Sequence, residues 1–272
     1  MGAMKLKRLM ALSLCLLVGG FATWDGGSSA QAASTTWQWV KTKKYPDVAY
    51  HLKDATKSAT MWDLKHNKKI HNLKNYPKTT WYLSQSVKLQ MGKKSGIYYL
   101  VKNNTNKVAG LVYRDYLKKG VNPADKLAND PAVKAYGGGL AGIKSFREEK
   151  KLQVDILALF PGTILNDALS ADAKTDLNAA PELGRKYSTT NKNAKAIGIF
   201  SPYNWIKTTA KTDYSKLVAD ALTAQGYTAA KRRNYKGYQI GIYATPHGYV
   251  TGYKNWVSGY GSWGIYLVPT AD

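Results

Sequence analysis

Short apolar segments separated by turn residues fill the chain between Tyr50 and Leu117. They predict strands at Ala59–Leu64, Lys68–Leu73, Thr79–Ser84, Val87–Met91, Gly96–Val101 and Lys107–Tyr113. The connections are rich in Asn, Gly and Pro, which tolerate or enforce turn dihedrals. Helical periodicity is missing from this region. Regular short strands with such turns predict a small β-barrel or sandwich.

The segment LVYRDYL, residues 111–117, combines aromatic and cationic side chains. Neighbouring side chains on a strand point to opposite faces. The alternation predicts one face with Leu111, Tyr113 and Asp115 and another with Val112, Arg114 and Tyr116. One face would then be buried while the other displays a cation and an aromatic ring.

Beyond Gly120 the pattern becomes mixed. A short helical segment is predicted within Asn122–Gly139 and a longer helix at Ile164–Ala179. The clearest helix has Tyr214, Leu217, Val218, Ala221 and Leu222 on one apolar stripe, with Asp213 or Thr212 as its cap and Gly226 as its stop. Buried-type strands are predicted at Val154–Phe160, Ala196–Phe200, Tyr238–Ala244 and Ser262–Val268. The fold class is therefore α+β overall, with an α+β or small α/β domain at 121–272 after an all-β domain at 33–120.

The first 32 residues have the features of a signal peptide. Lys5, Lys7 and Arg8 precede a short apolar run, Met10–Val18, and Ala30-Gln31-Ala32 fits a cleavage signal. The expectation is a secreted chain cleaved after Ala32, with no membrane span in the mature protein. The single cysteine, Cys15, lies in the apolar run, so the mature chain would have no thiolate chemistry.

Basic residues are concentrated in the first domain. Residues 33–120 contain 18 Lys and Arg against 4 Asp and Glu, whereas residues 121–272 contain 19 against 12. Such a field attracts polyanions. Nucleic acid is not expected as the partner, because the chain is exported and Lys outnumbers Arg by 34 to 6.

The first domain resembles a known family in several places. The segments KNYPKTTW, YYLVKN and NKVAGLVYRDYLKKG are similar to GW-type, bacterial Src-homology-3-like modules of Gram-positive, lactobacillus-type surface proteins. The resemblance covers about residues 50–120 and implies a small barrel that binds the cell wall. The closing strand of that family usually carries a Gly-Trp pair and a second Trp, where this chain has Gly110, Leu111 and Tyr113.

The expected ligand is therefore an anionic wall polymer of the teichoic acid type, or peptidoglycan. Candidate contacts are the cations and rings on the predicted strands and turns: Lys88, Lys93, Lys94, Lys102, Lys107, Tyr113, Arg114, Tyr116, Trp62 and Trp81. No metal site is expected: His66 and His71 are five residues apart but have no evident third ligand, and they are interpreted as surface or strand residues.

Residues 121–272 lack a recognisable catalytic motif. Two matches to G-x-G-x-x-G, at 137–142 and 259–264, do not sit between a predicted strand and helix, so no nucleotide cofactor is expected. His247, the single histidine of this half, is interpreted as a turn residue. Acidic residues that leave a glycosidase-type carboxylate pair open are Asp155, Asp167, Asp172, Asp176, Glu182, Asp213 and Asp220.

Three functions remain open. The first is a secreted, non-catalytic surface protein that the basic domain retains on the wall. The second is a peptidoglycan-modifying hydrolase or carboxypeptidase with its catalytic domain at 121–272. The third is an adhesin for a glycan or host protein, with Trp256 and Trp263 as candidate stacking rings.

Overall fold

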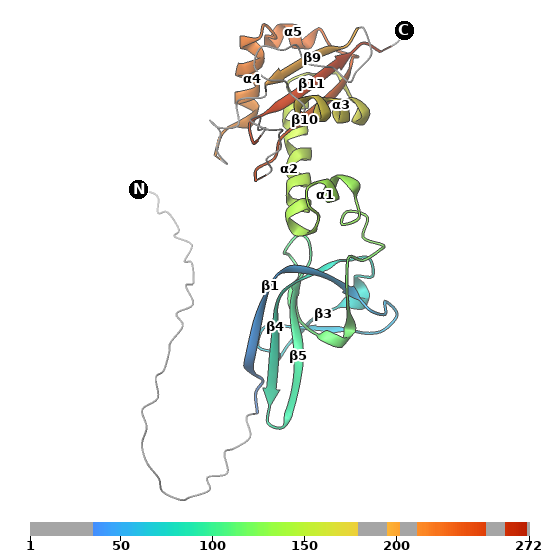
Figure 1. Cartoon of the computed structure of the whole chain (residues 1–272), viewed down its shortest axis with the longest axis vertical. Coiled ribbons are helices and arrows are strands. Elements are labelled where there is room, and N and C mark those ends of the chain that lie inside the picture. The colour runs from blue at the N-terminus through green and yellow to red at the C-terminus, as the bar shows by residue number, and fades with distance from the viewer. Residues whose placement is uncertain (1–34, 179–194, 202–210, 249–258, 271–272) are drawn as a thin grey trace, which may run out of the picture.

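The computed structural model describes residues 35–178, 195–201, 211–248 and 259–270. Figure 1 shows two β-sheets at opposite ends of a long helix, α2 (Gly139–Leu157). The predicted signal peptide and Trp256 lie outside the described residues. Within the described ranges, none of the helices is both long and apolar enough to cross a membrane. The fold is mixed α and β, as predicted.

The first sheet is a curled, antiparallel sheet of seven strands in the order β3-β2-β6-β5-β4-β1-β7. The strands are β1 Gln38–Leu52, β2 Thr60–Trp62, β3 Lys69–Asn72, β4 Trp81–Met91, β5 Lys94–Lys102, β6 Ala109–Tyr113 and β7 Leu117–Lys119. Two 3-10 turns, η1 Leu73–Asn75 and η2 Arg114–Tyr116, interrupt the series. Each predicted strand of this region overlaps an observed one, and two adjacent predictions merge into β4.

Both faces of this sheet are packed, because adjacent residues of one strand enter different clusters. Val101 and Val112 belong to the concave core, whereas Leu100 and Leu111 belong to a smaller cluster on the outer face. A register shift in β4 between Leu83 and Gln85 moves the following residues to the opposite face. The sheet therefore does not have the one buried and one free face predicted from LVYRDYL: Leu111 and Val112 are both fully buried.

The second sheet has four strands in the order β8-β10-β11-β9, with β8 and β10 parallel and the other pairs antiparallel. Its elements after α1 (Pro131–Ala135) and α2 are β8 Ile164–Leu165, α3 Asp167–Asn178, β9 Ile197–Ser201, α4 Tyr214–Ala224, α5 Ala229–Arg233, β10 Gln239–Ala244 and β11 Trp263–Val268. Helices cover both faces (Figure 1). The helix at 214–224 begins at its predicted cap, since the Asp213 carboxylate accepts from the Lys216 backbone N–H at 3.1 Å.

Strict alternation in β10 and β11 explains this three-layer arrangement. Ile242 and Ile265 pack with residues of α2 and α4, whereas Tyr243 and Tyr266 pack with α3. Apolar side chains on both faces of a strand require a cover on both faces.

The strand predicted at Val154–Phe160 is wrong. Residues 154–157 complete α2, and turns follow through Phe160. Leu152 and Ile156 are one helical turn apart and are buried against the second sheet, whereas Val154 is 61% exposed. A short apolar run does not by itself separate a strand from a buried helix end.

The segment after β7 packs back onto the curled sheet. Tyr82 of β4 is buried against Val133 and Ile143 of the two helices. The Asp125 carboxylate accepts from the backbone N–H of Thr80 at 3.0 Å, and Arg147 of α2 donates to the Asn104 carbonyl at 2.8 Å. These contacts fix the start of α2 to the first sheet.

Candidate functional site

A continuous line of rings runs along the outer face of the curled sheet. We call it the aromatic row; its members are Trp37, Trp62, His66, Tyr98, Tyr113 and Tyr116. Successive ring centroids lie 4.8 Å (Trp37–His66), 4.5 Å (His66–Tyr98), 5.5 Å (Tyr98–Tyr113) and 5.8 Å (Tyr113–Tyr116) apart. These four contacts are edge-to-face, and the Trp62 ring stacks on His66 at 4.5 Å. Aromatic rings at such distances stabilise one another and present π-faces and edges to a ligand.

Strand pairing and one turn assemble the middle of the row. Tyr98 of β5 lies directly opposite Tyr113 of β6. Gly96 leaves room for both rings, because a Cβ there would lie 3.2 Å from Tyr98 and 3.4 Å from Tyr113. The η2 turn ends the strand alternation at Tyr113 and brings Tyr116 to the same side. The prediction that Tyr113 and Tyr116 occupy opposite faces is therefore wrong.

His66 connects the remaining rings of the aromatic row, because it contacts Trp37, Trp62 and Tyr98. This residue has a φ of 55° and is only 6% exposed, and neither ring nitrogen has a hydrogen-bond partner among the residues that the structure describes. Burial lowers the pKa of this imidazole, so the neutral ring packs between the indoles. Its interpretation as a surface residue is wrong; His71, by contrast, is partly buried and contacts the Tyr76 hydroxyl at 3.1 Å.

The burial of His66 predicts an acid-sensitive β-rich unit. Because its pKa is lowered on folding, the unfolded chain binds more protons below the ordinary imidazole pKa of about 6.5. The free energy of unfolding should fall as the pH drops below that value, down to the lowered folded-state pKa. His66→Asn, which has no titrating ring and tolerates positive φ, should lose less stability between neutral pH and mild acid in urea titrations. Equal acid losses in the two proteins would contradict a buried neutral His66.

A hollow lies at each end of the row. The first, of about 710 Å³, is lined by Trp37, Trp39, Lys65 and His66 among others. The second, of about 620 Å³, is lined by Lys53, Lys57, Asp115 and Tyr116 among others. Trp39 and Tyr116 are 40% and 42% exposed, so each hollow has an accessible ring at its edge.

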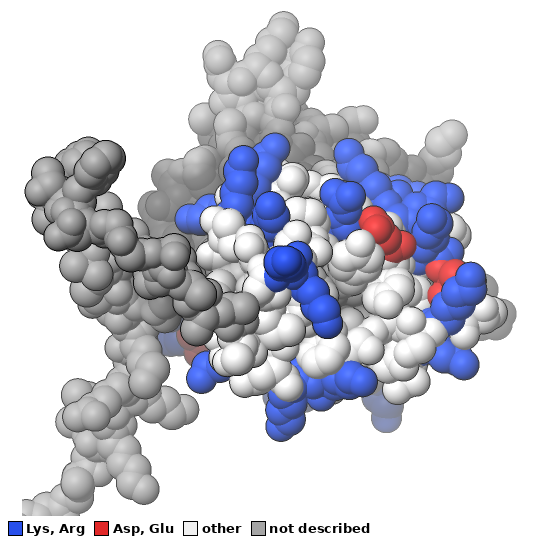
Figure 2. Space-filling view, turned by 90° about the horizontal axis from the view of Figure 1, so that it is seen from below, with Lys and Arg blue, Asp and Glu red and all other residues white. Residues whose placement is uncertain are grey.

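Basic side chains border this surface. The Lys69 ammonium lies 5.6 Å from the Trp62 ring centroid, and Lys65 and Lys53 each line one hollow. Seen from the end of the β-rich unit, many Lys and Arg side chains are spread over the surface and few Asp or Glu are visible (Figure 2). Lysines therefore lie beside the rings of the aromatic row and beside both hollows.

The lysines selected from the sequence are not gathered into one patch. Lys93 and Lys94 are exposed at the β4–β5 turn, whereas Lys107 is exposed at the β5–β6 turn, at the other end of the nine-residue β5. Such a strand is roughly 26 Å long. Lys102 is half-buried and pairs with Asp47 at 3.0 Å. Lys88 pairs across the sheet with Ile97, which puts it on the face opposite to Tyr98.

The candidate rings and Arg114 from the same prediction lie in different parts of the sheet. Trp62, Tyr113 and Tyr116 belong to the aromatic row, and exposed Arg114 pairs with Asp115 at 3.2 Å. Trp81 is fully buried in the concave core, so it is removed from the candidate contacts. The sequence interpretation missed Trp37, Trp39 and His66, although the density of Trp before the first predicted strand is a usable signal.

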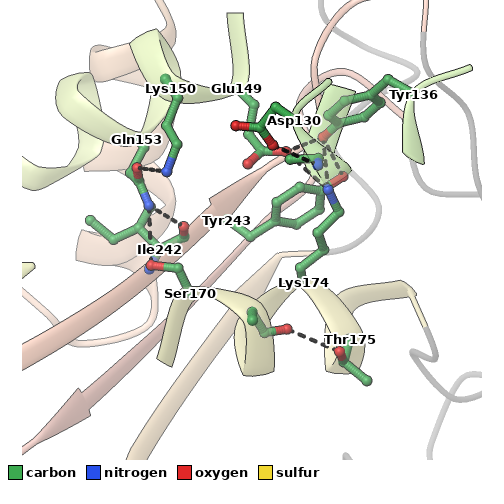
Figure 3. Close-up of polar contacts among 12 residues, drawn as sticks. Asp130, Tyr136, Glu149, Lys150, Gln153, Ser170, Lys174, Thr175, Ile242 and Tyr243 are labelled. Atoms are coloured by element: carbon green, nitrogen blue, oxygen red, sulfur yellow. Dashed lines mark hydrogen bonds and ion pairs between the residues drawn. The ribbon is translucent and has the colours of Figure 1, made fainter. Parts of the chain in front are cut away.

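The second sheet and the helices that cover it form a second unit. In this unit, polar groups hold α2 and α3 to the edge of β10 (Figure 3). The Gln153 amide donates to the Ile242 carbonyl at 3.0 Å, and the Ile242 N–H donates to the Ser170 hydroxyl at 3.0 Å. These side chains satisfy backbone groups that a neighbouring strand would otherwise pair.

A second group at this edge surrounds Lys174 of α3. Its ammonium pairs with Glu149 at 3.0 Å and lies 4.3 and 4.8 Å from the ring centroids of Tyr136 and Tyr243. Tyr136 also donates to Glu149 (Figure 3). Burial raises the pKa of the Tyr136 phenol, which keeps it a proton donor.

The structure places three sequence-based candidates of this unit differently from what was expected. Trp263 is fully buried in the core, so it offers no stacking surface for an adhesin. Asp155 lies in α2 rather than at a strand start and pairs with Lys151 at 2.6 Å. Asp176 is buried and accepts from the Tyr266 hydroxyl. Among the described residues, no group of three or more His, Cys, Asp and Glu side chains has the geometry of a metal site.

Comparisons with known proteins found no match among family models, curated proteins or solved structures.

Proposed function

We propose that the protein is secreted and is retained on a Gram-positive cell wall by residues 33–120, which bind an anionic wall polymer of the teichoic acid type. The observation that carries the proposal is the aromatic row with Lys53, Lys65 and Lys69 beside it, in a region with 18 basic against 4 acidic residues. Lysines pair with phosphate as point charges, and the rings stack on the sugar or polyol parts of the same polymer.

The resemblance to GW-type, Src-homology-3-like modules supports this assignment. A curled antiparallel sheet with a 3-10 turn before its last strand is compatible with that architecture. Retention by this unit requires no catalytic chemistry. The adhesin alternative is weaker, because Trp263, one of its two candidate rings, is buried.

Sedimentation with purified cell walls tests the proposal. The full-length protein is mixed with walls that keep their teichoic acids and with walls from which these polymers have been chemically removed. We expect at least about a tenfold loss of bound protein on the stripped walls, since polyanion contacts supply most of the affinity. Equal binding to both wall preparations would exclude the anionic polymer as the ligand.

A further inference from the structure

The hollow beside Trp37 and Trp39 combines exposed apolar side chains with polar ones. It has a volume of about 710 Å³ and lies on the surface of the β-rich unit. Trp39 is 40% exposed and Leu64, which lines the same hollow, is 54% exposed. Large apolar side chains that are grouped and stay this accessible are typical of a binding surface.

Strand pairing determines where the Trp39 ring lies. Trp39 of β1 is directly opposite Leu89 of β4, and Leu89 packs with Trp37 in the apolar cluster of the outer face. Opposite residues of an antiparallel pair project to the same face of the sheet. A register shift between Trp39 and Lys41 follows, and such a bulge bends the strand. Both indoles therefore lie on the outer face, at one end of the aromatic row.

The Trp39 indole is held in place through its nitrogen. Its Nε1–H donates to the Leu64 carbonyl at 3.0 Å, which connects β1 to the turn after β2. The Asp63 carboxylate stabilises that turn, because it accepts from the backbone N–H groups of Asn67 at 2.9 Å and Lys68 at 3.2 Å. A ring whose polar atom is already satisfied presents its face to a ligand and loses little freedom on binding.

The rest of the lining is mostly polar and carries little charge. Gln38 and Asn67 contribute side-chain amides and Thr35 a hydroxyl group, and all three residues are exposed. Among the described residues around this hollow, Lys65 is the single one with a charge, since His66 is neutral. Amides and hydroxyl groups both donate and accept hydrogen bonds, which suits a ligand with hydroxyl groups.

We propose that this hollow binds a sugar ring of a neutral glycan, with Trp39 as the stacking surface. A pyranose ring has apolar C–H groups on its faces and hydroxyl groups around its edge. It therefore matches an exposed indole that has amides and a hydroxyl group beside it. This site deepens the proposed function and rests on it in one point, namely that the glycan belongs to a cell wall. It adds a contact that does not depend on charge.

Other occupants match the hollow less well. An apolar peptide segment or a second copy of this chain would cover the amides of Gln38 and Asn67 without giving them hydrogen bonds, which costs free energy. A phosphate group would meet one ammonium group there, that of Lys65, whereas Lys53 and Lys57 both line the hollow at the other end of the row.

Isothermal titration calorimetry with the full-length protein tests this site, because the heat signal does not depend on tryptophan. The probes are neutral trisaccharides of N-acetylglucosamine and of glucose. We expect saturable binding of at least one of them, with the same affinity in low and in molar salt, since no counterions are released. Trp39→Ala should weaken this binding roughly tenfold, a loss typical of one stacking ring. Trp39→Phe, which keeps a ring, should retain part of the affinity.

Tyr116→Ala is the matched control. It removes a ring of similar exposure, 42%, that lies at the other hollow. Its affinity for the trisaccharide should stay within about twofold of the original, because distant sites act independently. Asn67→Ala is a second variant of the site. It removes an exposed amide, so we expect a loss of about threefold in affinity with an unchanged circular dichroism spectrum.

Three results would overturn the sugar site. They are no binding of either trisaccharide, undiminished binding by Trp39→Ala, and the same loss in Tyr116→Ala as in Trp39→Ala. A concentration-dependent dimer that Trp39→Ala abolishes would instead identify a second copy of this chain as the occupant.

Failure of the sugar site and failure of the anionic-polymer proposal give different results. Trisaccharide binding together with equal binding to intact and stripped walls would keep the sugar site and exclude the polyanion. Loss of binding on stripped walls without trisaccharide binding would do the reverse.

Discussion

Gly241→Ala is expected to destabilise the second unit by about 3 kcal/mol or more, which lies at the upper end of overpacking effects. A Cβ at position 241 would lie 2.2 Å from the backbone carbon of Leu169 and 2.4 Å from its carbonyl oxygen. These are backbone atoms of α3, so they move only if the helix leaves the sheet. Urea denaturation followed by circular dichroism measures the loss, and hydrogen exchange in α3 and β10 locates it.

Gly198→Ala is the control for this substitution. Gly198 lies on β9 of the same sheet, and its Cβ would meet ring atoms of Phe200 and Tyr266 at 3.0 Å. Side-chain rings can shift by a few tenths of an ångström, so a loss below about 1.5 kcal/mol is expected. If the two variants lose the same stability, α3 does not lie as close to β10 as described.

The second large effect concerns the lysines beside the aromatic row. Neutralising Lys53, Lys65 and Lys69 to Gln should weaken wall binding roughly 100-fold at low salt, by analogy with basic residues at an anionic membrane surface. The three ammonium groups are exposed and border the row or its hollows. None of the three forms a salt bridge within the described residues, so folding stability should change little.

A matched variant changes the same number of charges elsewhere. Lys126, Lys134 and Lys144 are exposed in and around α1 and the start of α2, away from the row. Their replacement by Gln lowers the net charge equally but should reduce binding much less. Equal losses in both triple variants would mean that overall charge, not the lysine-bordered row, holds the protein on the wall.

Much of the fold follows from local patterns. The strands around Met61, Tyr99 and Val112 were predicted because apolar residues and turn chemistry mark them directly. The helix at 214–224 was predicted from its stripe and its Asp213 cap. In contrast, the first part of β1 is almost entirely exposed and lysine-rich, so it lacks the apolar alternation that predicts a strand. It forms a strand because it pairs with β4.

The candidate sites depend on features that a linear pattern does not contain. The register shift at Leu83 and the η2 turn decide which rings meet on the outer face. Lys94 and Lys102, which the sequence analysis grouped as contacts for one ligand, lie at opposite ends of β5. The contact between Trp39 and Leu64 joins residues 25 positions apart, and only the folding of the sheet brings them together.

The salt dependence of binding to teichoic acid-bearing walls shows whether lysine–phosphate contacts hold the protein there. Lysine–phosphate contacts release counterions, so the logarithm of the binding constant should fall linearly with the logarithm of salt concentration. We expect a steep negative slope for the original protein and a shallower one for the Lys53, Lys65 and Lys69 variant. Binding that persists unchanged in molar salt, with the same slope in both proteins, would contradict it.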